Sequence, residues 1–333
     1  MVSTSAEAVT GVRAGVRGAL GRVPPIAAFG PIIALLLACA FFAFQTDRFL
    51  TGQNFSLILQ QVMVVGVVAI GQTLIILTAG IDLSCGMVMA LGSIVMTKFA
   101  VDLGLDPYLS IACGFVVCAA FGFLNGALIT LVRLPPFIVT LGTLNIAFAI
   151  TQIYSQSQTV TNLPDALVYL GNTFRLGQTA VTYGTVLMLA MYLATWFVLR
   201  ETAFGRHVYA LGNSPEATRL MGIPTRALLV VVYTLASLFY GLAALLLVAR
   251  TGVGDPQAGQ TDNLDSITAV VLGGTSLFGG RGMILNTLVG ALIVGVFRNG
   301  LTLMGVPSVY QILITGILVI LAVTTDQLSR RKA

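Results

Sequence analysis

An acidic residue interrupts apolar sequence at residues 80–86, which read Gly-Ile-Asp-Leu-Ser-Cys-Gly. A carboxylate at the centre of a bilayer costs about 2.5–3.5 kcal/mol on insertion scales, so Asp82 requires a partner or water there. Asp82 and Ser84 can cap the helix that follows, since Gly80 and Gly86 let the backbone turn. The same side chains can instead face a hydrated pathway, and the two roles are compatible.

A short helix with signals at both ends is predicted at residues 214–222. Ser214 is expected to be the N-cap, Pro215 the first helical residue, and Glu216 a complement to the positive helix end. Arg219 favours the C-terminal end, and Gly222 supplies a left-handed stop. The helical spacing gathers three residues into one apolar face: Ala217, Leu220 and Met221. This face either docks a partner or rests on a membrane surface.

A glycine-rich break is predicted at residues 273–282, where five of ten residues are glycine. It comprises Gly273, Gly274, Thr275, Gly279, Gly280 and Gly282. Such a run opposes a regular lipid-facing helix and permits close backbone approach or bending. It does not end in the Gly-Lys-Ser/Thr of a phosphate-binding loop, so no ATP site is predicted in this chain. One histidine and four cysteines without a CxxC pair support no metal site or disulfide framework.

The elements that carry these stretches are predicted from composition. The 333 residues are 57% hydrophobic and 9% charged, and mean hydropathy is +0.96, whereas soluble proteins carry about 25% charged residues. Because one crossing takes about 20 apolar residues, the sequence predicts an all-α polytopic membrane protein with about ten transmembrane spans. We place these spans at 26–44, 56–79, 87–101, 108–132, 134–154, 181–199, 227–249, 266–278, 283–297 and 308–324. The spans at 87–101 and 266–278 are short and adjoin glycine-rich breaks.

Basic residues set the predicted orientation. Arginines gather on one set of connections and at both ends, which the positive-inside rule assigns to the cytoplasm together with both termini. This distribution also accounts for the net charge of +5 without a nucleic-acid partner. The predicted organisation is a basic N-terminal arm at 1–25, a membrane domain at 26–325 with a cytoplasmic coupling loop at 200–226, and a basic tail at 326–333.

Three segments in register resemble one known family: residues 80–84, 209–217 and 271–276. The chain resembles the ribose-type monosaccharide permease of bacterial ABC importers, the sugar branch of the binding-protein-dependent inner-membrane components. The likeness runs from about residue 49 to the C-terminus, and Cys85 stands where the family commonly has valine. A likeness to the branched-chain amino acid permeases is weaker, because their equivalent turn reads differently.

This resemblance implies a type II importer-like permease that is not an enzyme. Two permease copies, most simply a homodimer, form the pathway in the inner membrane. A cytoplasmic ABC ATPase binds ATP–Mg, and a periplasmic sugar-binding protein delivers a monosaccharide. Carried over to this chain, residues 214–222 become the coupling helix that sits in the ATPase. The identity of the sugar stays open.

Polar side chains inside apolar segments are candidates for the pathway. Amides both donate and accept hydrogen bonds, which suits a neutral sugar, but they also bond between membrane helices. The candidates are Gln61, Gln72, Asn125, Asn145 and Asn286. Acidic residues on predicted outer connections either dock the binding protein or are simply solvated: Asp165, Asp255, Asp262 and Asp265.

Two other function classes fit the sequence less well. An ion-coupled secondary transporter commonly places ionisable residues within its spans, whereas Asp82 stands almost alone there. An intramembrane enzyme lacks candidates, because His207 belongs to a predicted cytoplasmic loop and no HExxH sequence occurs.

Overall fold

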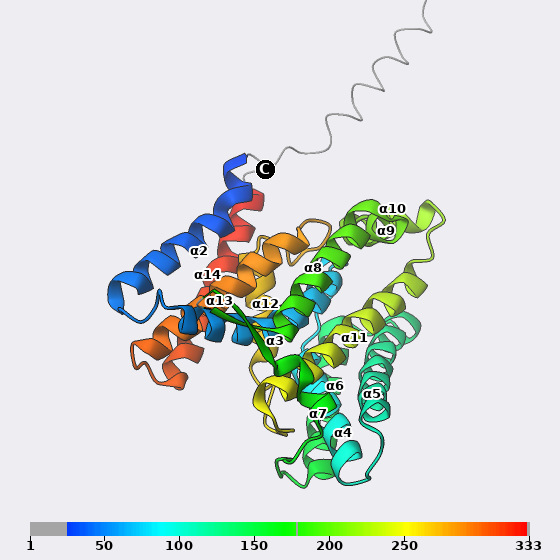
Figure 1. Cartoon of the computed structure of the whole chain (residues 1–333). Helices are drawn as coiled ribbons and strands as arrows, with labels where there is room; N and C mark the ends of the chain where they lie inside the picture. Colours follow the sequence, from blue (N-terminus) through cyan, green and yellow to red (C-terminus); the bar gives the residue numbers. More distant parts are fainter. Residues whose placement is uncertain (1–24, 178, 332–333) are drawn as a thin grey trace, which may run out of the picture.

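The computed structural model describes residues 25–177 and 179–331, and they form a mainly helical protein (Figure 1). The helices are α2 (Pro25–Gln45), α3 (Gly52–Leu77), α4 (Cys85–Val101), α5 (Pro107–Ala127), α6 (Pro136–Ser155), α7 (Asp165–Val168), α8 (Tyr183–Glu201), α9 (Ala203–Asn213), α10 (Pro215–Leu220), α11 (Thr225–Thr251), α12 (Asp262–Leu272), α13 (Ile284–Leu303) and α14 (Ser308–Arg331). A π-helical turn at Leu128–Val132 extends α5, and a 3-10 turn at Tyr169–Gly171 follows α7.

One short antiparallel hairpin departs from the all-α prediction. Strands β1 (Thr173–Leu176) and β2 (Thr179–Thr182) pair with Thr173 opposite Thr182. Thr182 ends the hairpin and also caps α8, because its side chain accepts a hydrogen bond from the Thr185 N–H. β-branched residues favour extended backbone, so the predicted span at 181–199 begins two residues late as a helix.

Helix α3 forms the centre of the molecule. It packs against α11, α13, α12 and α8, and nearly all its residues from Val62 onward are buried. Helices α5 and α11 also pack closely. A side chain on Gly122 would collide with the Tyr233 carbonyl, and a side chain on Gly126 would collide with the Val230 backbone. Small residues four apart thus let two apolar helices approach.

Six of the described helices are long and apolar enough to cross a membrane. They are Gly52–Leu77, Pro107–Val132, Pro136–Ser155, Tyr183–Glu201, Thr225–Thr251 and Ile284–Leu303. Shorter apolar helices are Phe29–Gln45, Cys85–Val101 and Ser308–Ile317. The predicted span at 266–278, expected to be short and to adjoin a glycine-rich break, is helical over only part of its length. Helix α12 ends at Leu272, and Gly274 then takes a left-handed φ of 80° that ends regular helix.

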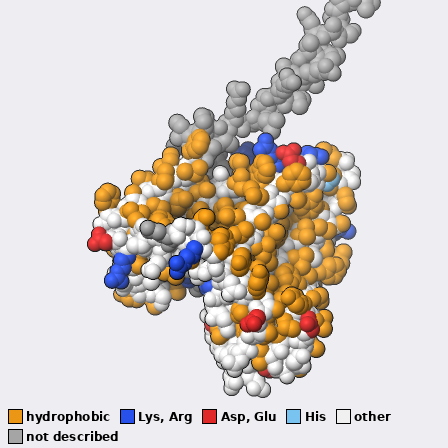
Figure 2. All heavy atoms as spheres, viewed as in Figure 1, with side chains coloured by type: hydrophobic (Ala, Val, Ile, Leu, Met, Phe, Trp, Pro, Cys, Tyr) orange, Lys and Arg blue, Asp and Glu red, His pale blue; other side chains and the backbone are white. Residues whose placement is uncertain are grey.

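Hydrophobic side chains cover a broad area of the face of the molecule that Figure 2 shows. Large apolar residues such as Ile153, Val116 and Leu193 are 77%, 66% and 60% exposed. Patches of this extent suit contact with lipid or with another subunit rather than with water.

The two described ends of the chain lie toward the same end of the molecule. The start of α2 and the end of α14 are near the top of Figure 1, as are α9 and α10, while the α4–α5 connection lies at the bottom. The predicted basic arm falls almost entirely outside the described residues. Within the predicted tail at 326–333, α14 continues as helix to Arg331.

Candidate functional site

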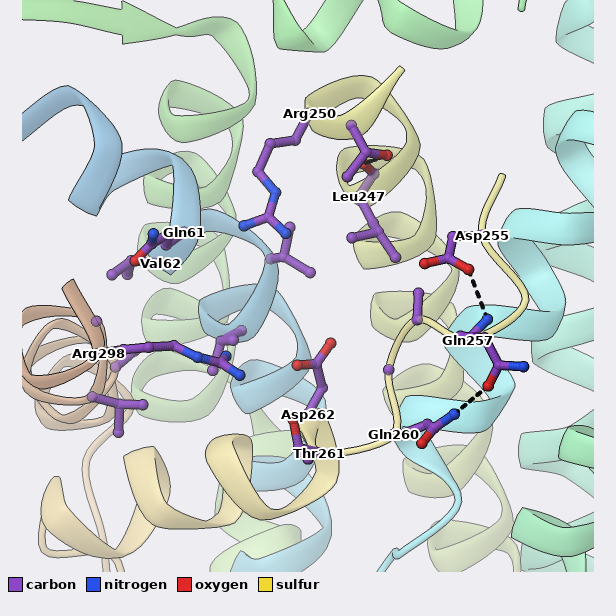
Figure 3. Close-up of a pocket in the computed structure, with 18 of the residues that line it drawn as sticks. Gln61, Val62, Leu247, Arg250, Asp255, Gln257, Gln260, Thr261, Asp262 and Arg298 are labelled. Atoms are coloured by element: carbon purple, nitrogen blue, oxygen red, sulfur yellow. Dashed lines mark hydrogen bonds between the residues drawn. The ribbon is translucent and has the colours of Figure 1, made fainter. Parts of the chain in front are cut away.

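A cavity of about 420 Å³ lies between α3, α11, α13 and the segment that joins α11 to α12 (Figure 3). We call it the charged cavity. Its polar lining includes Gln61, Arg250, Gln257, Gln260, Asp262 and Arg298, and its apolar wall includes Val62, Leu247 and Val294. Ligand sites for small molecules commonly measure about 300–1,000 Å³, so the cavity has room for a small polar ligand.

Charges of both signs face this cavity. Arg250 from α11 and Asp262 from α12 project toward its interior from opposite sides (Figure 3). Arg298 donates from Nη1 to Asp265 Oδ2 at 2.8 Å, and the Asp265 side chain is only 7% exposed. Asp265 therefore belongs to a partly buried ion pair. The expectation that it lies in a docking surface or is solvated is wrong, because α12 packs against α13 and Asp265 pairs with Arg298 of that helix.

The segment after α11 folds inward beside α4. A Cβ on Gly254 would meet the Thr97 side chain, and Gly259 and Gly86 approach so closely that a Cβ on either would meet the other's carbonyl. Glycine is required at position 259 because its φ is also left-handed, at 78°. The segment thus crosses from one end of α4 to the other and forms one wall of the charged cavity.

Asp82 anchors a chain of buried hydrogen bonds. Its Oδ1 accepts from the Ser84 backbone N–H at 2.8 Å and from the Ser84 hydroxyl at 2.6 Å. Asn125 Nδ2 donates to Ser84 Oγ at 3.1 Å, and the Thr143 hydroxyl donates to Asn125 Oδ1 at 2.8 Å. These hydrogen bonds tie α6 and α5 to the turn at residues 82–84. All four side chains are buried.

The expected capping role of this turn is wrong in its detail. Helix α4 begins at Cys85, and the N-cap Ser84 forms no side-chain bond to the helix because its hydroxyl is directed to Asp82. Gly80 packs against the Tyr233 hydroxyl, and Gly86 packs against Gly259. At both positions glycine allows a neighbouring segment to approach the backbone more closely than a side chain would permit.

The five amide candidates occupy different surroundings. Gln61 lines the charged cavity and Asn125 lies in the buried chain. Gln72 is fully buried and donates to the Asp82 carbonyl at 2.5 Å. Asn145 is exposed on α6 and donates to the Leu141 carbonyl at 3.0 Å. Asn286 lies in the first turn of α13, where its backbone packs against Gly273.

The predicted short helix is present as α10. The Ser214 side chain accepts from the Ala217 N–H at 3.3 Å, Pro215 is the first helical residue, and Gly222 has a φ of 81°. Glu216 and Arg219 pair at 3.0 Å on the exposed side. The apolar face is open, since Ala217 is exposed and Leu220 and Met221 are 79% and 66% exposed.

The glycine-rich break contacts both the end of α9 and the end of α3. The Gly280 N–H donates to the Leu77 carbonyl at 2.9 Å. A Cβ on Gly280 would meet Asn213, and one on Gly212 would meet the Leu77 carbonyl and the Gly280 nitrogen. We call this contact of α3, α9 and the break the inner junction.

A tyrosine fastens the break to α9. The Tyr209 hydroxyl donates to the Gly282 carbonyl at 2.9 Å. Burial raises the pKa of Tyr209 above its ordinary value, so the hydroxyl keeps its proton and remains a donor. Within the break, Gly273 packs on α13, Gly274 and Gly279 have left-handed φ, and the Thr275 side chain is buried. The inner junction thus joins segments that are distant in the sequence.

The sequence did not identify the charged residues of the cavity as a group. Arg250 and Arg298 stand at the ends of apolar segments and could be assigned only to an outer side. Their neighbours Gln257 and Gln260 belong to a connection without periodicity, where Gln257 is held by the Asp255 carboxylate and by Gln260 (Figure 3). Only the inward fold of this connection brings them together, and no spacing signal records that fold.

Comparison with known proteins gives one family across most of the chain. The family model described as "Branched-chain amino acid transport system / permease component" matches residues 54–323. The chain is 46% identical to the fructose import permease protein of Rhizobium meliloti over 91% of this chain and 86% of that protein. No solved structure gives a significant match.

Further relatives are also named as permease proteins for sugars. The chain is 38% identical to the ribose import permease protein of Bacillus subtilis, over 90% of this chain and 92% of that protein. It is 35% identical to the D-allose transport system permease protein of Escherichia coli K12, over 89% and 90% of the two chains. With its family match and its membrane-length helices, this chain belongs to the permease components of these transport systems and is a multi-pass protein of the inner membrane.

Proposed function

We propose that the chain is the membrane-spanning permease subunit of an ATP-driven importer and that its cargo is a monosaccharide. The observation that carries this proposal is the 46% identity to a fructose import permease over 91% of the chain. Relatives named for ribose and D-allose support a sugar rather than an amino acid, although the family description names amino acids. The three named sugars differ, so the class of cargo is better supported than any one sugar.

The charged cavity is the proposed binding site for the sugar. Its amides Gln61, Gln257 and Gln260 offer donors and acceptors to hydroxyl groups. The side-chain oxygen of Gln61 is buried and has no hydrogen-bond partner within the described structure, so it is available to a hydroxyl donor. The guanidinium of Arg298 already has the carboxylate of Asp265 as partner. A neutral polyol suits this balance of charges better than an ion.

Helix α10 is the proposed contact with the ATPase subunit. That subunit, and not this chain, would bind ATP–Mg. Its exposed Leu220 and Met221 offer an apolar knob, and its caps at Ser214 and Gly222 keep it from fraying. A shift of α10 would reach Gly280 through Asn213 and then α3 through Leu77. Because Gln61 belongs to α3, this rigid path leads from the ATPase to the charged cavity.

The proposed topology has about ten crossings with both termini and α10 in the cytoplasm. The six long apolar helices and three shorter ones supply nine, and α12 with its glycine-rich break supplies a broken tenth. We further propose that two copies of the chain form the pathway and that a periplasmic sugar-binding protein docks on the outer side, where Asp165 is exposed.

Uptake in cells that lack this chain tests the function. We expect deletion to abolish ATP-dependent uptake of one labelled monosaccharide, with fructose, ribose and allose tried first, and the restored chain to recover it. Depletion of ATP with the proton gradient intact should stop uptake. Uptake that follows the proton gradient would establish an ion-coupled transporter instead, and loss of leucine uptake alone would establish an amino acid permease.

A further inference from the structure

A second cavity lies apart from the charged cavity, where α8 ends, α9 passes and α13 begins. We call it the Trp196 pocket; its volume is about 470 Å³. Its apolar wall is formed by Trp196, Leu199, Met283 and Ile284. The pocket lies at the end of a membrane-length helix, since Tyr183–Glu201 is one of the six candidate crossings. It therefore opens where a lipid headgroup region would be.

Two arginines complete the lining. The Arg200 guanidinium lies 5.3 Å from the centre of the Trp196 ring, and its Nε pairs with Glu201 at 3.2 Å. Arg206 donates only to the backbone carbonyl of Glu201, at 3.4 Å, and has no carboxylate partner within the described residues. With one glutamate for two guanidinium groups, the rim of the pocket keeps an unbalanced positive charge.

An apolar wall beneath an unbalanced guanidinium matches one class of molecule. A soluble phosphate would leave the wall of Trp196 and Leu199 bare, and a zwitterionic lipid would bring its own cation to Arg206. A single-charged phosphate ester carrying an acyl chain satisfies both parts, since arginine binds phosphate oxygens in a planar fork. Basic pockets between membrane helices on the cytoplasmic side bind such headgroups.

We propose that the Trp196 pocket binds an anionic phospholipid of the inner leaflet, with the phosphate on Arg206 and Arg200 and the acyl chain along Trp196 and Ile284. The bound lipid would touch α9 close to the inner junction. Tyr209, which fastens the glycine-rich break at Gly282, also lines this pocket. The lipid would thus stiffen the helix that leads into α10.

The chain contains one tryptophan, so its fluorescence reports on this pocket alone. The full chain is placed in phosphatidylcholine nanodiscs that hold a small fraction of brominated phosphatidylglycerol or, in parallel, brominated phosphatidylcholine. Bromine quenches tryptophan only in contact. We expect stronger quenching by the anionic lipid, and Arg206→Gln should weaken its apparent affinity about fivefold. Arg206→Lys keeps the charge but loses the planar fork, so it should weaken the apparent affinity less than Arg206→Gln does.

A matched control and three contrary results complete the test. Arg226→Gln removes an exposed arginine from the start of α11, outside the pocket lining, and should leave quenching unchanged. Equal quenching by the two brominated lipids would overturn the proposal, as would an unchanged Arg206→Gln variant. Relief of the quenching by soluble glycerol phosphate would show a site for free phosphate esters and would overturn the assignment to a lipid.

Discussion

Two asparagines of this chain look alike in the sequence but have opposite surroundings. Asn125 and Asn145 both stand within apolar segments, and both were pathway candidates. Asn125 is buried and bridges Ser84 to Thr143, whereas Asn145 is exposed and bonds within its own helix. The sequence predicts that such amides need partners, but it cannot tell which partner each one finds, because that depends on how α4, α5 and α6 pack.

These different surroundings predict different stability. Asn125→Ala removes two buried side-chain hydrogen bonds, to Ser84 and from Thr143, so the free energy of unfolding should fall by about 1–3 kcal/mol. Asn145→Ala loses only a bond to the Leu141 carbonyl at an exposed position and should change the stability by less than about 0.5 kcal/mol. Thermal unfolding of both purified variants in detergent measures this contrast. Equal melting temperatures would contradict a structural role for the buried chain.

The ion pair between Asp265 and Arg298 is the second prediction at the scale of residues. Asp265→Asn removes a charged hydrogen bond at a side chain that is 7% exposed, and it should destabilise the protein by about 1.5–3 kcal/mol. The matched control is Asp102→Asn, which breaks a pair with Lys98 on an acid that is 47% exposed and should cost about 0.5 kcal/mol or less. If the two variants unfold alike, α12 is not fastened to α13 by this pair.

At the scale of elements, the inner junction explains why glycines gather near residue 280. The glycine content predicts a break there, and the capping residues predict a short helix at 214–222, because both signals are local. Neither signal predicts that the break contacts α3 and α9. That contact depends on backbone approach at Gly212, where a side chain would meet the Leu77 carbonyl. The predicted span at 266–278 extends beyond the end of α12 for the same reason, since the contact of Gly273 with the Asn286 backbone has no local sequence signal.

Gly212→Ala should therefore disturb the inner junction. The added methyl group overlaps the backbone of Leu77 and Gly280, which cannot move aside as a flexible side chain could. We expect a melting temperature lowered by several degrees, consistent with a loss of about 1–3 kcal/mol, and loss of uptake. Gly142→Ala is the control, since nothing lies within 4 Å of its added Cβ, and it should gain about 0.5–1 kcal/mol as a better helix former. A Gly212→Ala variant as stable and active as the parent would refute the close contact.

The apolar knob of α10 gives the fourth prediction. Leu220→Ser should leave folding unchanged, because the side chain is 79% exposed in the isolated chain. If the knob is seated in an ATPase, the loss of its apolar area should reduce co-purification of that subunit and sugar-stimulated ATP hydrolysis about tenfold or more. Leu176→Ser, on the exposed strand β1, is 69% exposed in the parent and should have neither effect. Normal coupling in the Leu220→Ser variant would remove α10 from the ATPase contact.

At the scale of the whole molecule, the composition predicts a membrane protein more securely than it predicts the path of each segment. Hydrophobicity is a sum over residues, so six long apolar helices could be found from the sequence. The inward fold of residues 254–259 and the break after α12 depend on backbone contacts between distant glycines. These two irregular segments form parts of the charged cavity and of the inner junction, so the proposed functional sites are the parts with the weakest local signals.

The orientation of the molecule yields the last prediction. If α10 is cytoplasmic, Glu216→Cys should resist a membrane-impermeant maleimide in spheroplasts and react in inside-out vesicles. Arg175→Cys, on the hairpin between α7 and α8, should behave in the opposite way, since one long crossing, α8, separates the two positions. Both residues are exposed, so neither result depends on local unfolding. The parent chain supplies the background, because Cys85 and Cys118 are buried and Cys39 and Cys113 lie half-buried in apolar helices. Reaction of Glu216→Cys from the outside would show that the proposed orientation is inverted. In that case α10 could not contact an ATPase, and the charged cavity would not lie on the side where sugar arrives.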